Sequence, residues 1–202
     1  MDRGRASPFF TKEDFPLLED KELNPTDISP DGRFLVGHSD RYRRGFQGSN
    51  GFFRAHHAAV LLDFDNPEQI FLVGKGCQPT FSPVDDWIYH VCGGGKECPL
   101  KSDIMRLQVS DRQKRTRYEA VVVRPDMIWG HTYQPRVSNN GEWLAYAATT
   151  DGCHDQDTCD YEVFLQRLRV LSLPIRLTRE PGNDQWPHLW VGAMWPPTLS
   201  RD

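Results

Sequence analysis

Pro135-Arg-Val-Ser138, the turn Asn139-Asn140-Gly141 and the apolar run Trp143-Leu-Ala-Tyr146 form the stretch of sequence that decides the fold. An Asn-Gly pair favours a tight hairpin turn because both residues tolerate a positive φ. The segments on either side are short, and the second is apolar and led by an aromatic residue, as expected of a buried strand. The stretch therefore predicts a β-hairpin.

The same pattern occurs twice more upstream of this hairpin. The segments from Pro25 to Gly32 and from Pro79 to Asp85 have the same order of proline, serine and turn, and apolar strands led by Phe34 and Trp87 follow them. The intervals between the first prolines are 54 and 56 residues, and a fourth copy begins another 52 residues on, at Pro187. A near-constant period of this length indicates a repeat architecture.

Each copy is expected to contain four short antiparallel strands. A third and a fourth strand follow each hairpin, and the third strand of the last copy alternates apolar and polar residues as a half-buried strand should. The expected third strands are 57–64, 103–109 and 161–168, and the fourth strands are 69–73, 118–123 and 173–178. No amphipathic helix of useful length interrupts them, and Pro and Gly clusters separate the copies. The sequence predicts an all-β fold.

Two motifs resemble the repeat of TolB-type β-propellers. They are Ser29-Pro-Asp-Gly32 before an apolar strand, and Arg176-Leu-Thr-Arg-Glu-Pro-Gly-Asn-Asp-Gln-Trp-Pro187 between two copies. The resemblance covers most of residues 20–192. It implies a radial array of four-stranded antiparallel blades, and hence a partial or small β-propeller. Members of this family occur mostly in the bacterial envelope, where they bind proteins or accompany a hydrolase as non-catalytic domains.

The expected blades do not complete a ring. An N-terminal extension (1–20), with a possible outer strand at Phe15-Pro-Leu-Leu18, precedes a repeat domain (21–192), and a tail (193–202) follows it. The blades are expected at 24–74, 78–124 and 134–179, with the start of a fourth at 184–192. Propellers usually close with about four to eight blades. We therefore expect a protein partner or a homo-oligomer.

Four of the five cysteines are spaced in matching pairs. Cys92 and Cys98 bracket one loop, Cys153 and Cys159 bracket another, and both loops occupy the same place in the repeat. This spacing predicts two local disulfides, with Cys77 outside both, and an oxidising compartment: periplasmic or extracellular. Free thiols, a zinc site and a cytoplasmic location are the alternatives, and no signal peptide is visible to decide the compartment.

Long loops are expected on one face of the blades, which is usually the binding face of a repeat protein. Aromatic and Arg side chains in these loops have the composition of protein interfaces. Alternatively, Trp129 and Trp186 fill gaps between blades. The candidate binding residues are Arg41, Tyr42, Arg44, Trp129, His131, Tyr133, Trp186 and Trp190.

Composition and motifs argue against several other functions. The net charge of -4 lacks the basic surface that nucleic-acid binding requires. No run approaches the roughly 20 apolar residues of a membrane helix. A hydrolase Gly-x-Ser-x-Gly motif is missing, Gly93-Gly-Gly-Lys96 lacks the rest of a phosphate loop, and Asp151 to Asp160 lack the spacing of a calcium loop. We expect no catalytic residues, no metal and no organic cofactor.

These features predict a non-catalytic protein-binding or scaffold module, acting as an accessory subunit of a cell-envelope complex. The alternative is the propeller portion of a peptidase or glycan-processing enzyme, or a partner to one.

Overall fold

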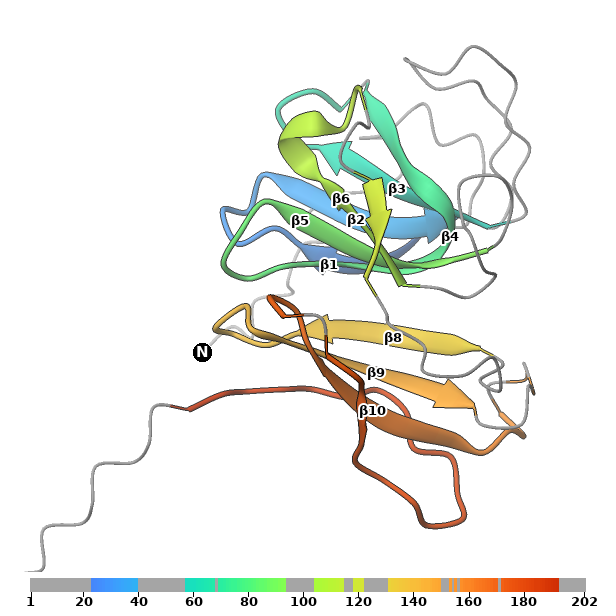
Figure 1. The fold of residues 1–202 in the computed structure, drawn as a ribbon. Coiled ribbons are helices and arrows are strands. Elements are labelled where there is room, and N and C mark those ends of the chain that lie inside the picture. Colours follow the sequence, from blue (N-terminus) through green and yellow to red (C-terminus); the bar gives the residue numbers. More distant parts are fainter. Residues whose placement is uncertain are drawn as a thin grey trace, which may run out of the picture.

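A computed structural model describes residues 23–39, 57–67, 69–93, 104–114, 118–121, 131–149, 153, 155, 157–170 and 172–192. These residues form a seven-stranded antiparallel sheet in the order β1-β2-β3-β4-β5-β6-β7 and a four-stranded sheet in the order β11-β10-β9-β8 (Figure 1). One short 3-10 turn, Val109–Asp111, is the single helical element in this part of the chain. The prediction of an all-β fold is confirmed.

The two sheets contain three four-stranded blades. Blade 1 consists of β1 (Leu23–Ile28), β2 (Phe34–Ser39), β3 (Ala58–Asp63) and the first half of β4 (Ile70–Phe81). Blade 2 consists of the second half of β4 with β5 (Trp87–Cys92), β6 (Ile104–Gln108) and β7 (Tyr118–Ala120). Blade 3 consists of β8 (Thr132–Val137), β9 (Trp143–Thr149), β10 (Tyr161–Arg167) and β11 (Ile175–Arg176).

Strand β4 belongs to two blades. Residues up to Lys75 pair with β3, and residues from Gly76 onward pair with β5. Gly76 has a φ of 139° and Gln78 a φ of 52°, and these left-handed conformations bend the chain from one blade to the next. The Gly and Pro residues here were expected to separate the copies, but the structure uses them to bend one continuous strand.

The hairpins of blades 1 and 3 share one set of hydrogen bonds. The Ser29 hydroxyl donates to the Asp31 carboxylate and accepts from the amide of Phe34. In blade 3 the Ser138 hydroxyl donates to the side-chain oxygen of Asn140, at 2.7 Å, and accepts from the amide of Trp143. Gly32 and Gly141 complete these turns with φ values of 74° and 69°. The Ser-x-Asp/Asn-Gly motif therefore fixes the hairpins locally.

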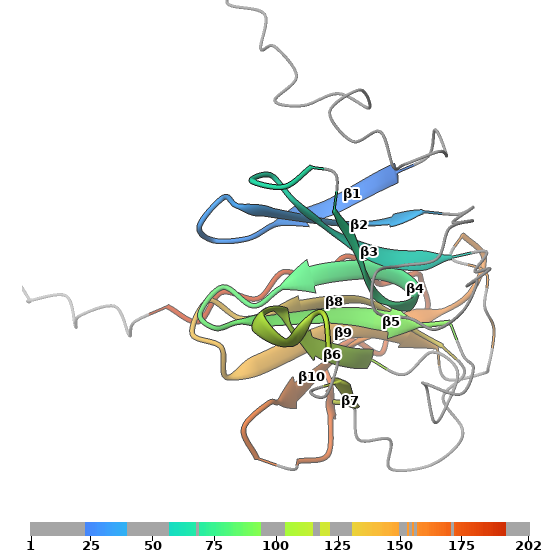
Figure 2. The same ribbon diagram turned by 90° about the horizontal axis from the view of Figure 1, so that it is seen from above.

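The core lies between the blades. One buried cluster joins blades 1 and 2 and includes Val36, Leu61 and Ile88. A second cluster joins blades 2 and 3, where Tyr89 and Ile104 meet Tyr146 and Phe164. Figure 1 shows the strands of blade 3 below those of blades 1 and 2, and Figure 2 shows β1, β2 and β3 to one side of blades 2 and 3.

The outer flank of blade 1 differs from expectation. Three blades that do not close a ring are expected to leave it without a neighbouring blade, but its side chains are buried, with Leu35 2% and Val60 0% exposed. These values refer to a single chain.

The fourth copy also differs from a regular blade. Residues 183–192 follow an extended course but form no strand. The extension 1–20, the tail 193–202 and the possible strand Phe15–Leu18 lie outside the described residues. The part of the chain that the structure describes contains no helix long and apolar enough to cross a membrane.

Candidate protein-binding site

Blade 3 has one covered face and one open face. Successive strand residues point to opposite faces of a sheet. Leu144, Tyr146 and Phe164 belong to the cluster shared with blade 2. The neighbours of these residues in β9 and β10, and the residues of β11 paired with them, therefore point away from blade 2. The inner part of this second side is buried, with Tyr133 4%, Ala147 0% and Tyr161 0% exposed. We call its outer part the open face, and it includes Val163, Leu165, Ile175 and Leu177.

Exposed apolar side chains concentrate beside this face. Of the eight large apolar side chains that are exposed within the described ranges, Ile28 and Val84 lie elsewhere. The other six come from the outer part of blade 3 and the segment after it: Val170, Leu173, Ile175, Leu177, Trp186 and Trp190. Clusters of exposed apolar side chains commonly mark protein interaction sites.

Trp186 is held by a contact that repeats from blade to blade. The side-chain oxygen of Gln78 accepts a hydrogen bond from the Gln134 amide at 2.7 Å. The side-chain oxygen of Gln134 accepts one from the Trp186 amide, also at 2.7 Å. All three residues precede a proline and have positive φ values of 52°, 54° and 60°. Residues 184–192 therefore begin a fourth copy in geometry, although the rest of that blade is not formed by described residues.

A second contact fixes the end of this segment. The Asn139 side chain accepts a hydrogen bond from the Val191 amide at 2.7 Å and donates one to the Val191 carbonyl at 3.1 Å. The segment thus runs beside β8 and is tied at both ends. Trp186 and Trp190 are nevertheless 65% and 78% exposed. The backbone is held in place while two large aromatic side chains face solvent.

The remaining candidate residues have different positions. Tyr133, which was expected on the loop face, is only 4% exposed and packs edge-on against Tyr161 at 5.5 Å between ring centroids. It belongs to a buried cluster with Ala147, Cys159 and Tyr161. His131 is half-buried beside β9, where its amide donates to the Thr149 hydroxyl. Trp186 does not fill a gap between described blades. Arg41, Tyr42, Arg44 and Trp129 lie outside the described residues.

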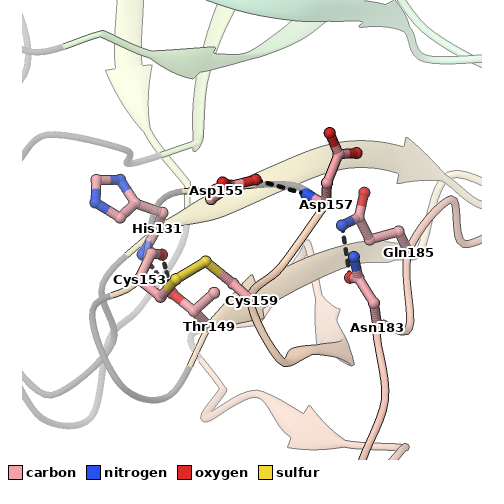
Figure 3. Close-up of a disulfide and its surroundings, with 8 residues drawn as sticks. All are labelled: His131, Thr149, Cys153, Asp155, Asp157, Cys159, Asn183 and Gln185. Atoms are coloured by element: carbon pink, nitrogen blue, oxygen red, sulfur yellow. Dashed lines mark hydrogen bonds between the residues drawn. A yellow bond between two sulfur atoms is a disulfide. The ribbon is translucent and has the colours of Figure 1, made fainter.

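The loop between β9 and β10 is closed by a disulfide, Cys153–Cys159, as expected (Figure 3). The Thr149 hydroxyl donates to the Cys153 carbonyl at 3.0 Å, and the Asp155 carboxylate accepts from the Asp157 amide at 2.8 Å. Cys92 is also disulfide-bonded. Its expected partner Cys98 lies outside the described residues. Cys77 takes part in no disulfide and packs against the Tyr133 and Cys159 cluster.

Removing this disulfide should cost moderate stability. In the chain-entropy model, a loop with a sequence separation of 6 contributes roughly 2 kcal/mol. The double variant Cys153→Ser, Cys159→Ser should therefore melt about 4–8 °C lower in a calorimetric scan. Cys77→Ser is the matched control and should change the melting temperature less. A double variant that melts with the native protein would contradict this expectation.

Polar side chains of successive inner strands form a row. The Asp27 carboxylate accepts from the Thr80 hydroxyl at 2.7 Å, and Arg136 donates to Thr80 at 3.0 Å. These residues occupy corresponding places in blades 1, 2 and 3. The row joins neighbouring blades through polar contacts. Among the described residues, no group of three or more His, Cys, Asp or Glu side chains is placed to hold a metal.

Comparisons with known proteins identify the fold. No family model matches the sequence, and no curated protein does. A TolB structure from Agrobacterium tumefaciens superposes on 74% of this chain with a TM-score of 0.52 and 18% identity. The described part of the chain folds as part of a TolB-like β-propeller. The chain spans 47% of that TolB. The tricorn protease matches at a TM-score of 0.46 and 12% identity, over 81% of this chain and 16% of its own.

Within the TolB-like blades, sequence reasoning missed the role of Gln78 and Gln134. Each side chain accepts the amide of the corresponding residue one blade further on. The signal was present, because Gln-Pro occurs at 78–79 and at 134–135 and Gln-Trp-Pro at 185–187. Their contacts place Trp186, which the sequence did indicate as a binding residue.

Proposed function

We propose that this chain is a non-catalytic protein-binding module that takes its partner on the open face of blade 3 together with the adjoining segment 184–192. The observation that carries the proposal is the pair of exposed tryptophans, Trp186 and Trp190, on a backbone held by hydrogen bonds to Gln134 and Asn139. Tryptophan is enriched among the residues that dominate protein interfaces. A held backbone also reduces the conformational entropy lost on binding.

Blades 1 and 3 differ in how far their outer sides are buried, and this difference limits the ways in which the chain can assemble. Blade 1 buries its outer flank, whereas blade 3 exposes apolar side chains. A head-to-tail ring would need the blade 1 flank of one copy to accept the open face of another. Burial of Leu35 and Val60 disfavours that arrangement. We therefore propose a different subunit, or a two-fold dimer in which two open faces meet.

We further propose that the module works in the cell envelope, as an accessory subunit of a larger complex. The Cys153–Cys159 disulfide supports an oxidising compartment. The TolB-like fold supports the same location through the family resemblance described above. A chemical map of disulfides in freshly isolated protein tests this part: an intact Cys153–Cys159 linkage is expected, and quantitatively free thiols would contradict it.

The mass of the native assembly tests the binding face. Tagged protein isolated from its own source under native conditions should exceed the 23.3 kDa of one chain by light scattering. Trp190→Glu should lower this mass to that of the single chain, because a charge on the segment beside the open face must be desolvated on binding. Ile28→Glu places the same charge at another exposed apolar position and should leave the assembly intact.

Two outcomes would contradict the proposal. One is a Trp190→Glu protein with the same native mass as the unmodified chain. The other is loss of the assembly in both glutamate variants, which would indicate a general effect of added charge. Circular dichroism of each variant establishes that the blades are folded before the masses are compared.

A further inference from the structure

A groove of about 330 Å3 lies between the hairpin turns of blades 1 and 2. The β1–β2, β4–β5 and β8–β9 turns lie together at one end of the strands, on the left in Figure 1. Apolar side chains form the walls of the groove: Pro30, Phe34, Phe81, Pro83, Val84 and Val109. Asp31, Asp85 and Asp86 complete the lining together with Ser29. None of these residues belongs to the open face.

The lining carries negative charge, and a cation, Arg33, acts on Asp31 from outside the groove. Three aspartates and no Lys, Arg or His line the groove. Arg33 and Arg112 lie near the ring of Phe34 but bind elsewhere. Arg33 donates to both oxygens of Asp63, at 3.1 and 2.9 Å, and Arg112 donates to the Val109 carbonyl.

The hairpins do not require all of this charge. Asp31 accepts from the Ser29 hydroxyl and the Arg33 amide, and Asn140 fills the same role in blade 3 as a neutral amide. The Ser29 hydrogen bond lowers the pKa of Asp31, so this carboxylate is ionised at neutral pH. Asp85 makes no hydrogen bond or ion pair with any residue that the structure describes.

The hairpins of blades 2 and 3 lie closer together than those that form the groove. A Cβ atom added to Gly141 would lie 2.1 Å from Cγ2 of Val84, so the third hairpin packs directly against the second. The corresponding space between blades 2 and 3 is thus narrowed. The second hairpin also lacks the glycine of the other two and has Asp85 and Asp86 in its turn.

We infer that this groove binds the side chain of a single Arg or Lys presented by an extended peptide segment of another protein. Long basic side chains lay their alkyl stem on apolar surface and keep the charged head beside polar groups. The apolar walls and the acidic rim provide both environments, and carboxylates bind such cations through charge-assisted hydrogen bonds. Its volume is at the low end for ligand pockets, which suits one side chain.

The arrangement favours an organic cation over a metal ion. The three carboxylates of the groove do not form a group that could hold a metal ion. Within the described ranges, no other group of His, Cys, Asp or Glu side chains does so either. An extended side chain needs no such convergence, because its stem occupies the apolar part of the groove. This inference does not rest on the proposed function of the open face.

Titration with a defined peptide tests the groove. The probe is N-acetyl-Gly-Arg-Gly-amide, and its citrulline analogue has the same shape without the charge. NMR spectra of the ¹⁵N-labelled full chain should show saturable shifts at the amides of Gly32, Val84 and Ser110 with the arginine peptide. The citrulline peptide should cause none, and the arginine shifts should weaken as salt is raised.

A double variant gives the sharper comparison. The variant Asp31→Asn, Asp85→Asn removes two negative charges. The amide that replaces the Asp31 carboxylate keeps an oxygen that can accept the hydrogen bonds of the turn, as Asn140 does in blade 3. We expect binding about fivefold to tenfold weaker. Glu180→Gln, which removes an exposed charge outside the groove, should bind like the native chain. Equal affinity of the double variant, equal binding of citrulline, or no shifts in the native chain would each overturn the inference.

Discussion

Replacing Gly76 by alanine is expected to reduce the free energy of unfolding by at least about 3 kcal/mol. A Cβ atom at this position would lie 1.9 Å from the carbonyl oxygen of Val91, which is backbone and cannot swing aside. Its φ of 139° is also a conformation that side chains rarely adopt. Both penalties act at the bend where β4 passes from blade 1 to blade 2, so the junction of the two blades must deform.

Gly182→Ala separates these two penalties. Gly182 has a similar φ of 151°, but no atom lies within 4 Å of its added Cβ. This control should lose about 1 kcal/mol, from backbone strain alone. Denaturant unfolding of both variants measures the difference. Equal losses would mean that β4 does not bend tightly against β5 at this point.

Replacing Arg176 by alanine is expected to reduce stability by about 3–5 kcal/mol. Its guanidinium binds the carboxylate of Glu162, whose side chain is 0% exposed. The Thr178 hydroxyl donates to the same carboxylate at 2.6 Å. Removing the arginine leaves a buried negative charge with one neutral donor, and this cost far exceeds that of losing an exposed ion pair.

Arg167→Ala is the matched control for this ion pair. Arg167 also lies in blade 3, but its side chain is 50% exposed. Its guanidinium nitrogen lies 4.0 Å from the nearer carboxylate oxygen of Glu142. Its removal should cost at most about 1 kcal/mol. Thermal unfolding ranks the two variants. A loss at Arg176 no greater than that at Arg167 would show that Glu162 reaches solvent.

The sequence predicted those elements that depend on local chemistry. The turn at Asn140-Gly141 and its counterpart at Asp31-Gly32 were recognisable because each hairpin is fixed by hydrogen bonds within a few residues. The course of β4 was not recognisable from the sequence, because Gly76 and Pro79 are as compatible with a break between two strands as with a bend in one strand. Only the pairing with β3 and β5 distinguishes these two outcomes.

Burial and charge across blades were harder to predict. Tyr133 and Trp186 look alike as aromatic residues near a proline, yet one is in the core and the other is exposed. Tyr133 packs against Tyr161 of its own blade, whereas Trp186 is 65% exposed, and local sequence does not distinguish these two environments. The acidic groove joins Asp31 and Asp85, which lie 54 residues apart, so only the packing of two hairpins reveals it.

Footprinting of tryptophan side chains tests the central claim most directly, because it reports on the open face in the assembly itself. Trp186 and Trp190 are exposed in the single chain, while Trp87 is half-buried under Arg106 and provides an internal reference. Hydroxyl-radical oxidation, read by mass spectrometry, should label Trp186 and Trp190 strongly in the isolated chain. In the native assembly both should become protected while Trp87 is unchanged. Undiminished oxidation of Trp186 and Trp190 in the assembly would contradict a partner on the open face of blade 3.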